Sequence, residues 1–300
     1  MPFQFAVGPE LCTGMNPSLL NLSTHINRND AQYILLQGRC PLPNAAGFTD
    51  IWGYVSTSGG AAQTIRANPT SGFTLAVVSD SVADVNTSGT GAWIVTVFYL
   101  DSSYNPWVAT FALNGQTAVT VPTSIVNPFN AAQTITPAAI ANCFRINGME
   151  VTAVGTGTVN AGNIYAYDNS ATVTAGVPQT AAKVYDCILI GDNLHSNSQF
   201  TIPANYYGMA IQISMNYTSA ASTVLQGKMR VQFTKGNNGI YIPLYLGSTG
   251  TANDGDAAID PCFAPIFQPQ SELRAQAYVS SATTCETQAL AALVIWPTLS

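Results

Sequence analysis

Short apolar segments of strand length, separated by turn residues, dominate the chain from about residue 73. Phe73 to Val78, Ala92 to Leu100 and Trp107 to Leu113 are rich in β-branched and aromatic residues, which favour strands. Asn114-Gly115 is the two-residue signal of a type I′ hairpin, and Thr117 to Val121 provides the returning strand. Turns every eight to twelve residues predict a β-sandwich rather than alternating strands and helices.

The same rhythm returns after Cys143. Met209, Ile211, Ile213 and Met215 alternate with smaller or polar residues, so we expect these four side chains to share one buried face. Eight or more strands in about 155 residues suit a two-sheet jelly roll or a related sandwich. The predicted strands are Phe144 to Val154, Asn163 to Asp168, Lys183 to Ile190, Phe200 to Ile202, Gly208 to Tyr217, Val224 to Phe233, Gly239 to Leu246, Glu272 to Val279 and Thr287 to Trp296.

These patterns predict an all-β protein with two antiparallel, jelly-roll-like β-sandwich domains and an irregular N-terminal arm. The predicted boundaries are 1–50 for the arm or docking segment, 51–142 for the first domain and 143–300 for the second. Five prolines interrupt the arm, although Ala31 to Gln37 has the character of a strand. Thr136 to Asn142 is the single helical candidate, because Pro137 would occupy a first helical turn after a threonine cap.

The chain carries very little charge. Charged residues make up 8% of its 300 residues, against about 25% in a typical soluble protein, and the formal net charge is −6. Weak repulsion between such surfaces favours association, so we expect a homo-oligomer; a stable monomer with a Ser/Thr-rich surface is the alternative. The nine Lys and Arg form no basic run, which argues against direct binding to nucleic acid.

No membrane span is expected, because the longest apolar stretch, near Ala289 to Trp296, is too short to cross a bilayer. The amino terminus lacks the cationic start and apolar core of a secretory signal, which is consistent with synthesis in a cytoplasm. The cysteines are widely spaced without a Cys-x-x-Cys pair, so buried free thiols are favoured over disulfides, which remain open. They are Cys12, Cys40, Cys143, Cys187, Cys262 and Cys285.

Enzymatic chemistry has few candidates in this chain. His25 and His195 are the two imidazole bases, and no Gly-x-Ser-x-Gly elbow accompanies them. We predict that the protein is not an enzyme, has no catalytic residues and binds no cofactor. A hydrolase that depends on His195 is the least favoured alternative.

A metal site is not predicted either. The best calcium candidate combines Asp254, Asp256 and Asp260 on a Gly-containing segment, but it lacks the glutamate that completes an EF-hand, so a solvated acidic turn is favoured. Asp80 and Asp84 are a weaker pair, interpreted as caps of turns. The glycine-rich segment 155–162 has no lysine and no following helix, so we interpret it as a hairpin turn rather than a phosphate loop.

Aromatic residues provide one candidate ligand surface. Trp93, Trp107, Tyr99 and Tyr104 would line a carbohydrate platform if they shared an exposed sheet face. Aromatic side chains on strands more often belong to a core, because burying each ring stabilises the fold by about 1.5–3 kcal/mol.

Several segments, in order, resemble a family of virion-associated proteins of marine bacteriophages and large algal DNA viruses. The matching segments include Val77-Val-Ser-Asp-Ser-Val-Ala-Asp84, Leu100-Asp-Ser-Ser-Tyr-Asn105, Asn160-Ala-Gly-Asn-Ile164 and Phe200-Thr-Ile-Pro-Ala-Asn205. The resemblance covers roughly residues 50 to 300 and is strongest from 74 to 165. The long arm and the apparent insertion from Phe129 to Pro137 depart from the family pattern.

The resemblance implies a β-rich, non-catalytic component of a virus particle, such as a minor capsid, cement or spike protein, located in the virion. Its partners would be copies of itself, with a trimer favoured, and other virion proteins. A carbohydrate-binding spike or fibre module for host attachment is the alternative function.

Overall fold

A computed structural model describes residues 31–40, 47–53, 66, 68–219, 227–249, 254–259, 266–279 and 285–298. The described part is built of β-strands, and its single helical element is the 3-10 turn η2 (Ala181–Lys183). The strands are β1 (Gln32–Cys40), β2 (Thr49–Asp50), β3 (Leu75–Ser79), β4 (Ala92–Asp101), β5 (Pro106–Ala112), β6 (Ser124–Asn127), β7 (Asn130–Ile135), β8 (Cys143–Val154), β9 (Ile164–Asp168), β10 (Val173–Thr174), β11 (Val177–Pro178), β12 (Val184–Ile188), β13 (Gln199–Thr201), β14 (Tyr206–Ser219), β15 (Gly227–Thr234), β16 (Tyr241–Thr249), β17 (Asp254–Ile259), β18 (Ile266–Phe267), β19 (Glu272–Val279) and β20 (Cys285–Pro297).

The strands from β3 to β12 form the first strand group. Its five-stranded antiparallel sheet has the order β7-β6-β5-β4-β8, and its three-stranded sheet has the order β12-β9-β3. One apolar cluster receives side chains from both sheets, such as Val95 and Phe111 from the first and Val77 and Ile164 from the second. The two sheets therefore pack face to face around a shared core.

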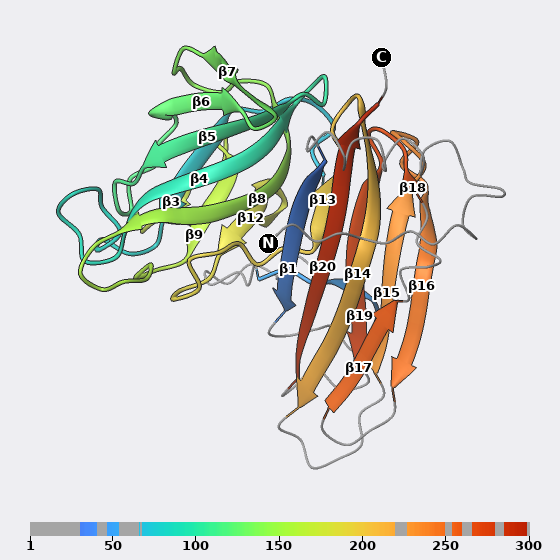
Figure 1. The fold of residues 1–300 in the computed structure, drawn as a ribbon. Coiled ribbons are helices and arrows are strands. Elements are labelled where there is room, and N and C mark those ends of the chain that lie inside the picture. Colours follow the sequence, from blue (N-terminus) through green and yellow to red (C-terminus); the bar gives the residue numbers. More distant parts are fainter. Residues whose placement is uncertain are drawn as a thin grey trace, which may run out of the picture.

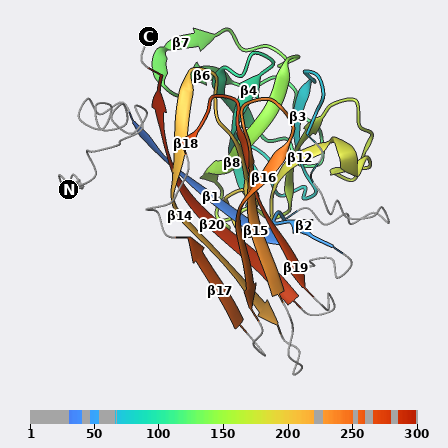
Figure 2. The same ribbon diagram turned by 90° about the vertical axis from the view of Figure 1, so that its right-hand side faces the viewer.

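The second strand group combines β1 and β2 with β13 to β20. One antiparallel sheet has the order β1-β20-β14-β17, with β18 on β14, and the other has the order β13-β19-β15-β16, with β2 on β19. Leu36, Ile213, Val231 and Leu293 meet in the apolar cluster between these sheets. In both views the first strand group lies against one end of the second, which extends away from it (Figure 1, Figure 2).

Strand pairing divides the chain differently from the predicted boundaries at residues 50 and 142. β8 follows residue 142 yet pairs with β4 over its whole length, from Ala92 opposite Val154 to Asp101 opposite Cys143. β1, placed in the predicted arm, pairs with β20 over nine positions and completes a sheet of the second strand group. Apart from β1 and β2, which join the second group, the two groups therefore separate along the chain between β12 and β13. Local turn signals do not reveal such non-local pairing.

The predicted helix at Thr136 to Asn142 is wrong. Residues 136–140 have no helical assignment, and the peptide N–H of Leu75 donates to the carbonyl of Ile140 at 2.9 Å. Ile140 is buried in the core of the first strand group. Tertiary burial of this side chain in an extended segment outweighs the local capping signal.

The predicted turns are modified in two places. The tight turn near Asn114 has Gly115 and Gln116 at its centre, because the N–H of Thr117 donates to the carbonyl of Asn114, so it lies one residue later than predicted. Gly115 has a φ of +59°, which suits glycine. Segment 155–162 is not a hairpin, since it connects β8 in one sheet to β9 in the other.

The alternation predicted for Met209 to Met215 holds for only half of the segment. Ala210 pairs with Leu293 and Gln212 with Ala292, so Ile211 is an extra residue in a β-bulge. A bulge moves the following side chains to the opposite face. Ala210, Ile213 and Met215 are therefore buried, whereas Met209 and Ile211 are only half-buried.

Candidate functional site

An ion pair joins the two strand groups near their contact. Arg145 on β8 donates from Nε to Glu272 Oε1 on β19 at 2.6 Å, and both side chains are about nine-tenths buried. Glu272 also accepts from the amide of Asn68 and the hydroxyl of Tyr241. The Arg145 guanidinium lies over the ring of Phe144 at 4.0 Å, which adds a cation–π contact. Each hydrogen-bonding partner restrains the geometry of this pair.

A second set of buried polar groups lies beside the ion pair. Asp50 accepts from the N–H of Arg66 at 2.6 Å and from the amides of Gln199 and Gln276. The Arg66 guanidinium donates in turn to the carbonyl of Ile146 on β8. Burial raises the pKa of Asp50, against the opposing effect of Arg274, and burial lowers the pKa of Arg66, against the charge of Asp186.

Two reciprocal hydrogen bonds complete this contact. The Asn147 amide donates to the carbonyl of Thr201 at 2.8 Å, and the N–H of Thr201 donates back to Asn147 Oδ1 at 2.9 Å. Together these groups form the polar seam, defined as Asp50, Arg66, Arg145, Asn147, Thr201 and Glu272. Because the hydrogen bonds of the polar seam are directional and largely buried, they hold the two strand groups in one relative orientation.

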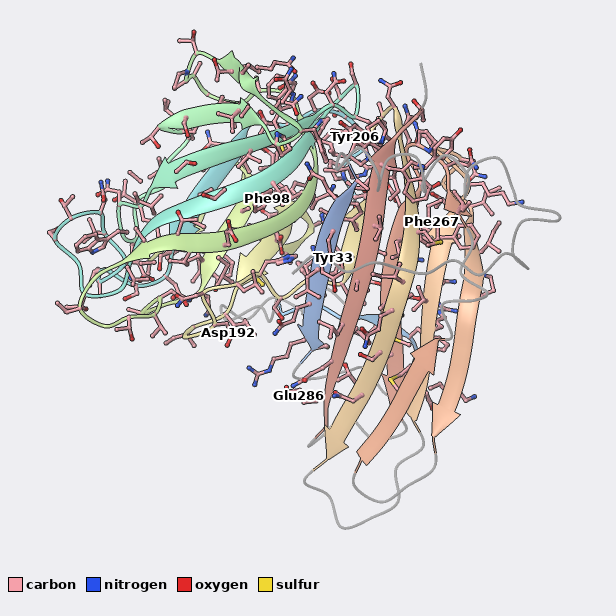
Figure 3. The ribbon with its side chains drawn as sticks, in the orientation of Figure 1. Tyr33, Phe98, Asp192, Tyr206, Phe267 and Glu286 are labelled. Carbon is pink, nitrogen blue, oxygen red and sulfur yellow. The ribbon has the colours of Figure 1, made fainter. Side chains whose placement is uncertain are left out.

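An apolar groove of about 390 Å³ opens beside the polar seam. One wall consists of the four consecutive residues 32–35 of β1, and the other includes Phe98 of β4 and residues 147–150 of β8. Phe129 lines the groove and stacks on Tyr206 of the second strand group, with ring centroids 4.4 Å apart. Figure 3 labels Tyr33 and Phe98 on the elements that form the two walls.

Among the described residues, the outer edge of β1 is only partly covered. Arg39 and Gln37 bond outward, because the N–H of Arg39 donates to Ser196 Oγ and the carbonyl of Gln37 accepts from the N–H of Asn197. Backbone groups of alternate residues in a strand point to the same side, so those of Leu35 and Tyr33 also point outward, here into the groove. Tyr33 is 60% exposed and Leu35 is 48% exposed. The groove therefore contains an open strand edge with exposed apolar side chains.

An ion pair lies at the C-terminal end of β1. Arg39 makes a bidentate contact with Glu286 on β20, at 2.7 and 3.0 Å, and its guanidinium lies 3.9 Å from Asp192. The hydrogen bond to Glu286 raises the pKa of Arg39. Burial raises the pKa of Glu286, but the hydrogen bonds from Arg39 and Gln288 outweigh it and leave this pKa lowered. This pair fixes β1 against its own sheet below the open edge, where Figure 3 labels Asp192 and Glu286.

His195, the imidazole singled out from the sequence, lies in the wall of the groove. Its Nδ1 is 3.3 Å from Asp186 Oδ2, but the angles do not make a hydrogen bond, and the side chain is 5% exposed. Its ring packs against Gly148, where an added Cβ would lie 3.2 Å from Cε1. His195 therefore fills space between β8 and β12. His25, the other histidine, lies outside the described residues.

Asp80 and Asp84 stabilise loops, as their interpretation as turn caps predicts. Asp84 is fully buried and accepts four hydrogen bonds, from the hydroxyl of Ser79 and from the N–H groups of Ala92, Ala161 and Gly162. Asp80 accepts from both nitrogens of Asn163 and from the hydroxyl of Tyr165. These carboxylates tie the loop after β3 to the loop before β9.

The proposed carbohydrate platform is not formed. Tyr99, Tyr104 and Trp107 are less than 10% exposed, and only Trp93 is half-buried. The indole of Trp107 donates to Asp101 and that of Trp93 to the carbonyl of Gly89. Core packing accounts for Tyr99 and Trp107, which belong to the apolar cluster of the first strand group.

The calcium candidate lies on a strand rather than on a loop. Asp254 and Asp256 belong to β17, where their backbone positions pair with Thr218 and Asn216 of β14. Asp260 lies outside the described residues. Within the described ranges, no three His, Cys, Asp or Glu side chains are grouped so that they could hold a metal ion.

Among the cysteines whose side chains the structure describes, two are buried free thiols in the first strand group. Cys143 and Cys187 are fully buried in the first strand group, and Cys40 is buried in the second. Burial raises the pKa of the Cys143 and Cys187 thiols well above the usual value, and the nearby arginines only partly oppose this effect. Cys12 and Cys262 lie outside the described residues, and only the backbone of Cys285 is described.

We expect Cys143 and Cys187 to resist alkylation in the native protein at pH 8. The thiolate is the reactive form, and burial both suppresses it and blocks access to the sulfur. Mass spectrometry after iodoacetamide treatment should find both peptides unmodified in native protein and modified in urea. Rapid modification of either thiol in native protein would contradict this burial.

No helix in the described part of the chain is long and apolar enough to cross a membrane.

The groove and the polar seam were missed by reasoning from the sequence. One signal was available. Because the chain has so few charged residues, those that do occur, such as Asp50, Arg66, Arg145 and Glu272, are candidates for buried ion pairs or hydrogen bonds.

No protein-family model and no curated protein matches the chain. Among solved structures, it is similar to the naturally empty top component of cowpea mosaic virus, with 8% identity over 75% of this chain and 83% of that chain, at a TM-score of 0.20. Infectious bursal disease virus strain Gx gives 10% identity, 89% and 71% coverage, and a TM-score of 0.20. The triple jelly-roll turret structure of an archaeal virus gives 11% identity, 90% and 59% coverage, and a TM-score of 0.21.

All three of these structures come from viruses, but some other matches are not viral. TM-scores this low mean that the likenesses carry no argument about this chain. The function proposed below therefore rests on the residues of this chain.

Proposed function

We propose that the protein is a structural component of a virus particle, such as a minor capsid, cement or spike protein, and acts by assembling with copies of itself and with other virion proteins. The observation that supports this proposal most directly is the apolar groove with its open strand edge at Tyr33 and Leu35. Exposed apolar patches beside an unpaired edge favour association with another chain. The low charge of the chain leaves little repulsion to oppose such contact.

The polar seam supports the same proposal. A subunit that must fit a closed assembly needs a fixed shape, because a small error in the angle between its parts is repeated in every copy. The buried pair of Arg145 and Glu272 restrains that angle more strongly than apolar contact alone, since its hydrogen bonds are directional. In this proposal the two strand groups are two jelly-roll-like sandwich domains that act as one rigid body.

The sequence resemblance to virion-associated proteins agrees with this role, and virion location and a favoured trimer are part of the proposal. We propose no catalytic step, cofactor or direct contact with nucleic acid. The carbohydrate-binding alternative loses its main support, because three of its four candidate aromatic residues are buried.

The native mass of the purified chain tests the proposal. Light scattering at several concentrations should give a stable oligomer. A structure of that oligomer should show interfaces that bury more than about 2,000 Å² in total, as obligate interfaces do. Substituting both Tyr33 and Leu35 with serine should shift the oligomer toward monomer. The matched control substitutes both Val82 and Ile190 with serine, because these apolar side chains are exposed away from the groove, and it should leave the oligomer unchanged. A monomer at every concentration would contradict self-assembly.

A further inference from the structure

The open edge of β1 has the geometry of a site for one more strand. Gln37 and Arg39 bond outward to residues 196 and 197, and within the described ranges this cover ends before Leu35 and Tyr33. The outward N–H and C=O groups of those two residues therefore face the groove. An extended segment laid beside them would be paired with β1 through main-chain hydrogen bonds, the mode of recognition called β-augmentation.

The lining of the groove selects for apolar side chains in that added strand. Phe98, Phe129 and Ile295 line it together with Tyr33 and Leu35, and Glu150 is the single acidic residue among the lining residues. An occupant therefore needs apolar residues at alternate positions, which share one face of a strand, and no charge. The part of β1 that lines the groove is residues 32–35, so an added strand of about five residues covers it.

One segment of this chain meets these requirements. Phe3, Phe5 and Val7 alternate with Gln4 and Ala6, and no charged side chain precedes Glu10. Residues 1–30 lie outside the described residues and lead directly to Ala31, next to the groove. Thirty residues of chain can span up to about 100 Å, which is enough to reach a neighbouring subunit.

We propose that residues Phe3 to Val7 of a second copy of this chain bind in the groove and pair with β1 at Tyr33 and Leu35. This inference rests on the proposed assembly function and names the contact that produces it. Each copy gives its amino-terminal segment to one neighbour and receives one from another, so the arrangement can close into a ring.

Photo-cross-linking of the full chain tests this contact directly. Copies with p-benzoylphenylalanine in place of Tyr33 are labelled with ¹⁵N and mixed, after dissociation, with unlabelled wild-type chains. Trypsin separates residues 1–28 from residues 29–39, because Arg28 and Arg39 are the first two cleavage sites. We expect a cross-link between a labelled 29–39 peptide and an unlabelled 1–28 peptide.

If every cross-link to 1–28 joins two ¹⁵N peptides, even with unlabelled chains in excess, the segment binds within its own chain, and this would overturn the proposal. Absence of any cross-link to 1–28 from an assembled oligomer would overturn it as well, while leaving the assembly function standing. A wild-type chain that is monomeric at every concentration would defeat both.

A matched pair of substitutions provides the second test. Phe5→Asp places a charge on the face that would enter the groove, and Gln4→Asp places the same charge on the opposite face. Phe5→Asp should weaken self-association by roughly tenfold or more, the effect of losing one buried phenylalanine, and Gln4→Asp should change it much less. Circular dichroism confirms that both variants fold, and equal effects of the two substitutions would contradict the proposed register.

Discussion

Replacing Asp84 with alanine is expected to destabilise the protein by about 3–6 kcal/mol. The carboxylate accepts from the N–H groups of Ala92, Ala161 and Gly162 at 2.6–2.9 Å. Its removal leaves these three N–H groups and the Ser79 hydroxyl without their acceptor, and each buried donor left unsatisfied costs about 1–3 kcal/mol. The carboxylate also fits closely against Gly91, where an added Cβ would collide with Asp84 Oδ1.

Urea unfolding followed by circular dichroism measures this loss. Asp168→Ala is the matched control, since Asp168 accepts a single exposed hydrogen bond from the N–H of Ser170 and its loss should cost less than about 1 kcal/mol. Equal effects of the two substitutions would mean that Asp84 does not tie the loops together. Asp84→Asn should lie between them, because an amide retains one acceptor oxygen.

Glu272→Ala is expected to cost about 3–5 kcal/mol, because it leaves the Arg145 guanidinium buried without its counterion. The substitution also removes the acceptor for Asn68 and Tyr241. The lost pair with Arg145 joins the two strand groups, so unfolding should become less cooperative, with the groups unfolding in separate steps. Urea denaturation followed at several wavelengths separates one transition from two.

The control for Glu272 is Glu286→Ala, which removes the carboxylate of the more exposed pair with Arg39. Side-chain exposures of 41% for Arg39 and 25% for Glu286 let solvent screen this pair, and its loss should cost no more than about 1 kcal/mol. The double variant Arg145→Met/Glu272→Met should recover much of the stability lost in Glu272→Ala, since no unpaired charge remains. A Glu272→Ala variant as stable as Glu286→Ala would contradict the importance of the polar seam.

The positions of several strands could be predicted closely from the sequence, although the strand predicted at Thr117 to Val121 is reduced to isolated bridges at Thr117 and Val119. Ala92 to Leu100 is β4, Phe144 to Val154 is β8, and Glu272 to Val279 is β19, each with boundaries shifted by no more than one residue. Alternating β-branched and aromatic residues determine these segments, because side-chain alternation and burial act on neighbours along the chain. The sequence also determined the low charge of the surface.

Other features depended on contacts between distant residues. Thr136 to Asn142 carries a local helix signal, but the burial of Ile140 beside Leu75 makes it extended. The bulge at Ile211 depends on pairing with β20, about eighty residues later, and no local pattern announces it. The aromatic residues Tyr99 and Trp107 had two interpretations, and only their position in the core decided between them.

The candidate site was determined by tertiary structure alone. Tyr33 and Leu35 belong to an ordinary strand pattern, and they become significant only because β1 borders a groove opposite Phe98. In the same way, Arg145 and Glu272 are 127 residues apart and meet only across the two strand groups. The sequence thus determined which segments are strands and how little charge they carry, since those properties are local. The tertiary structure decided which edges remain open and which charges meet, because both depend on pairing between residues far apart in the chain.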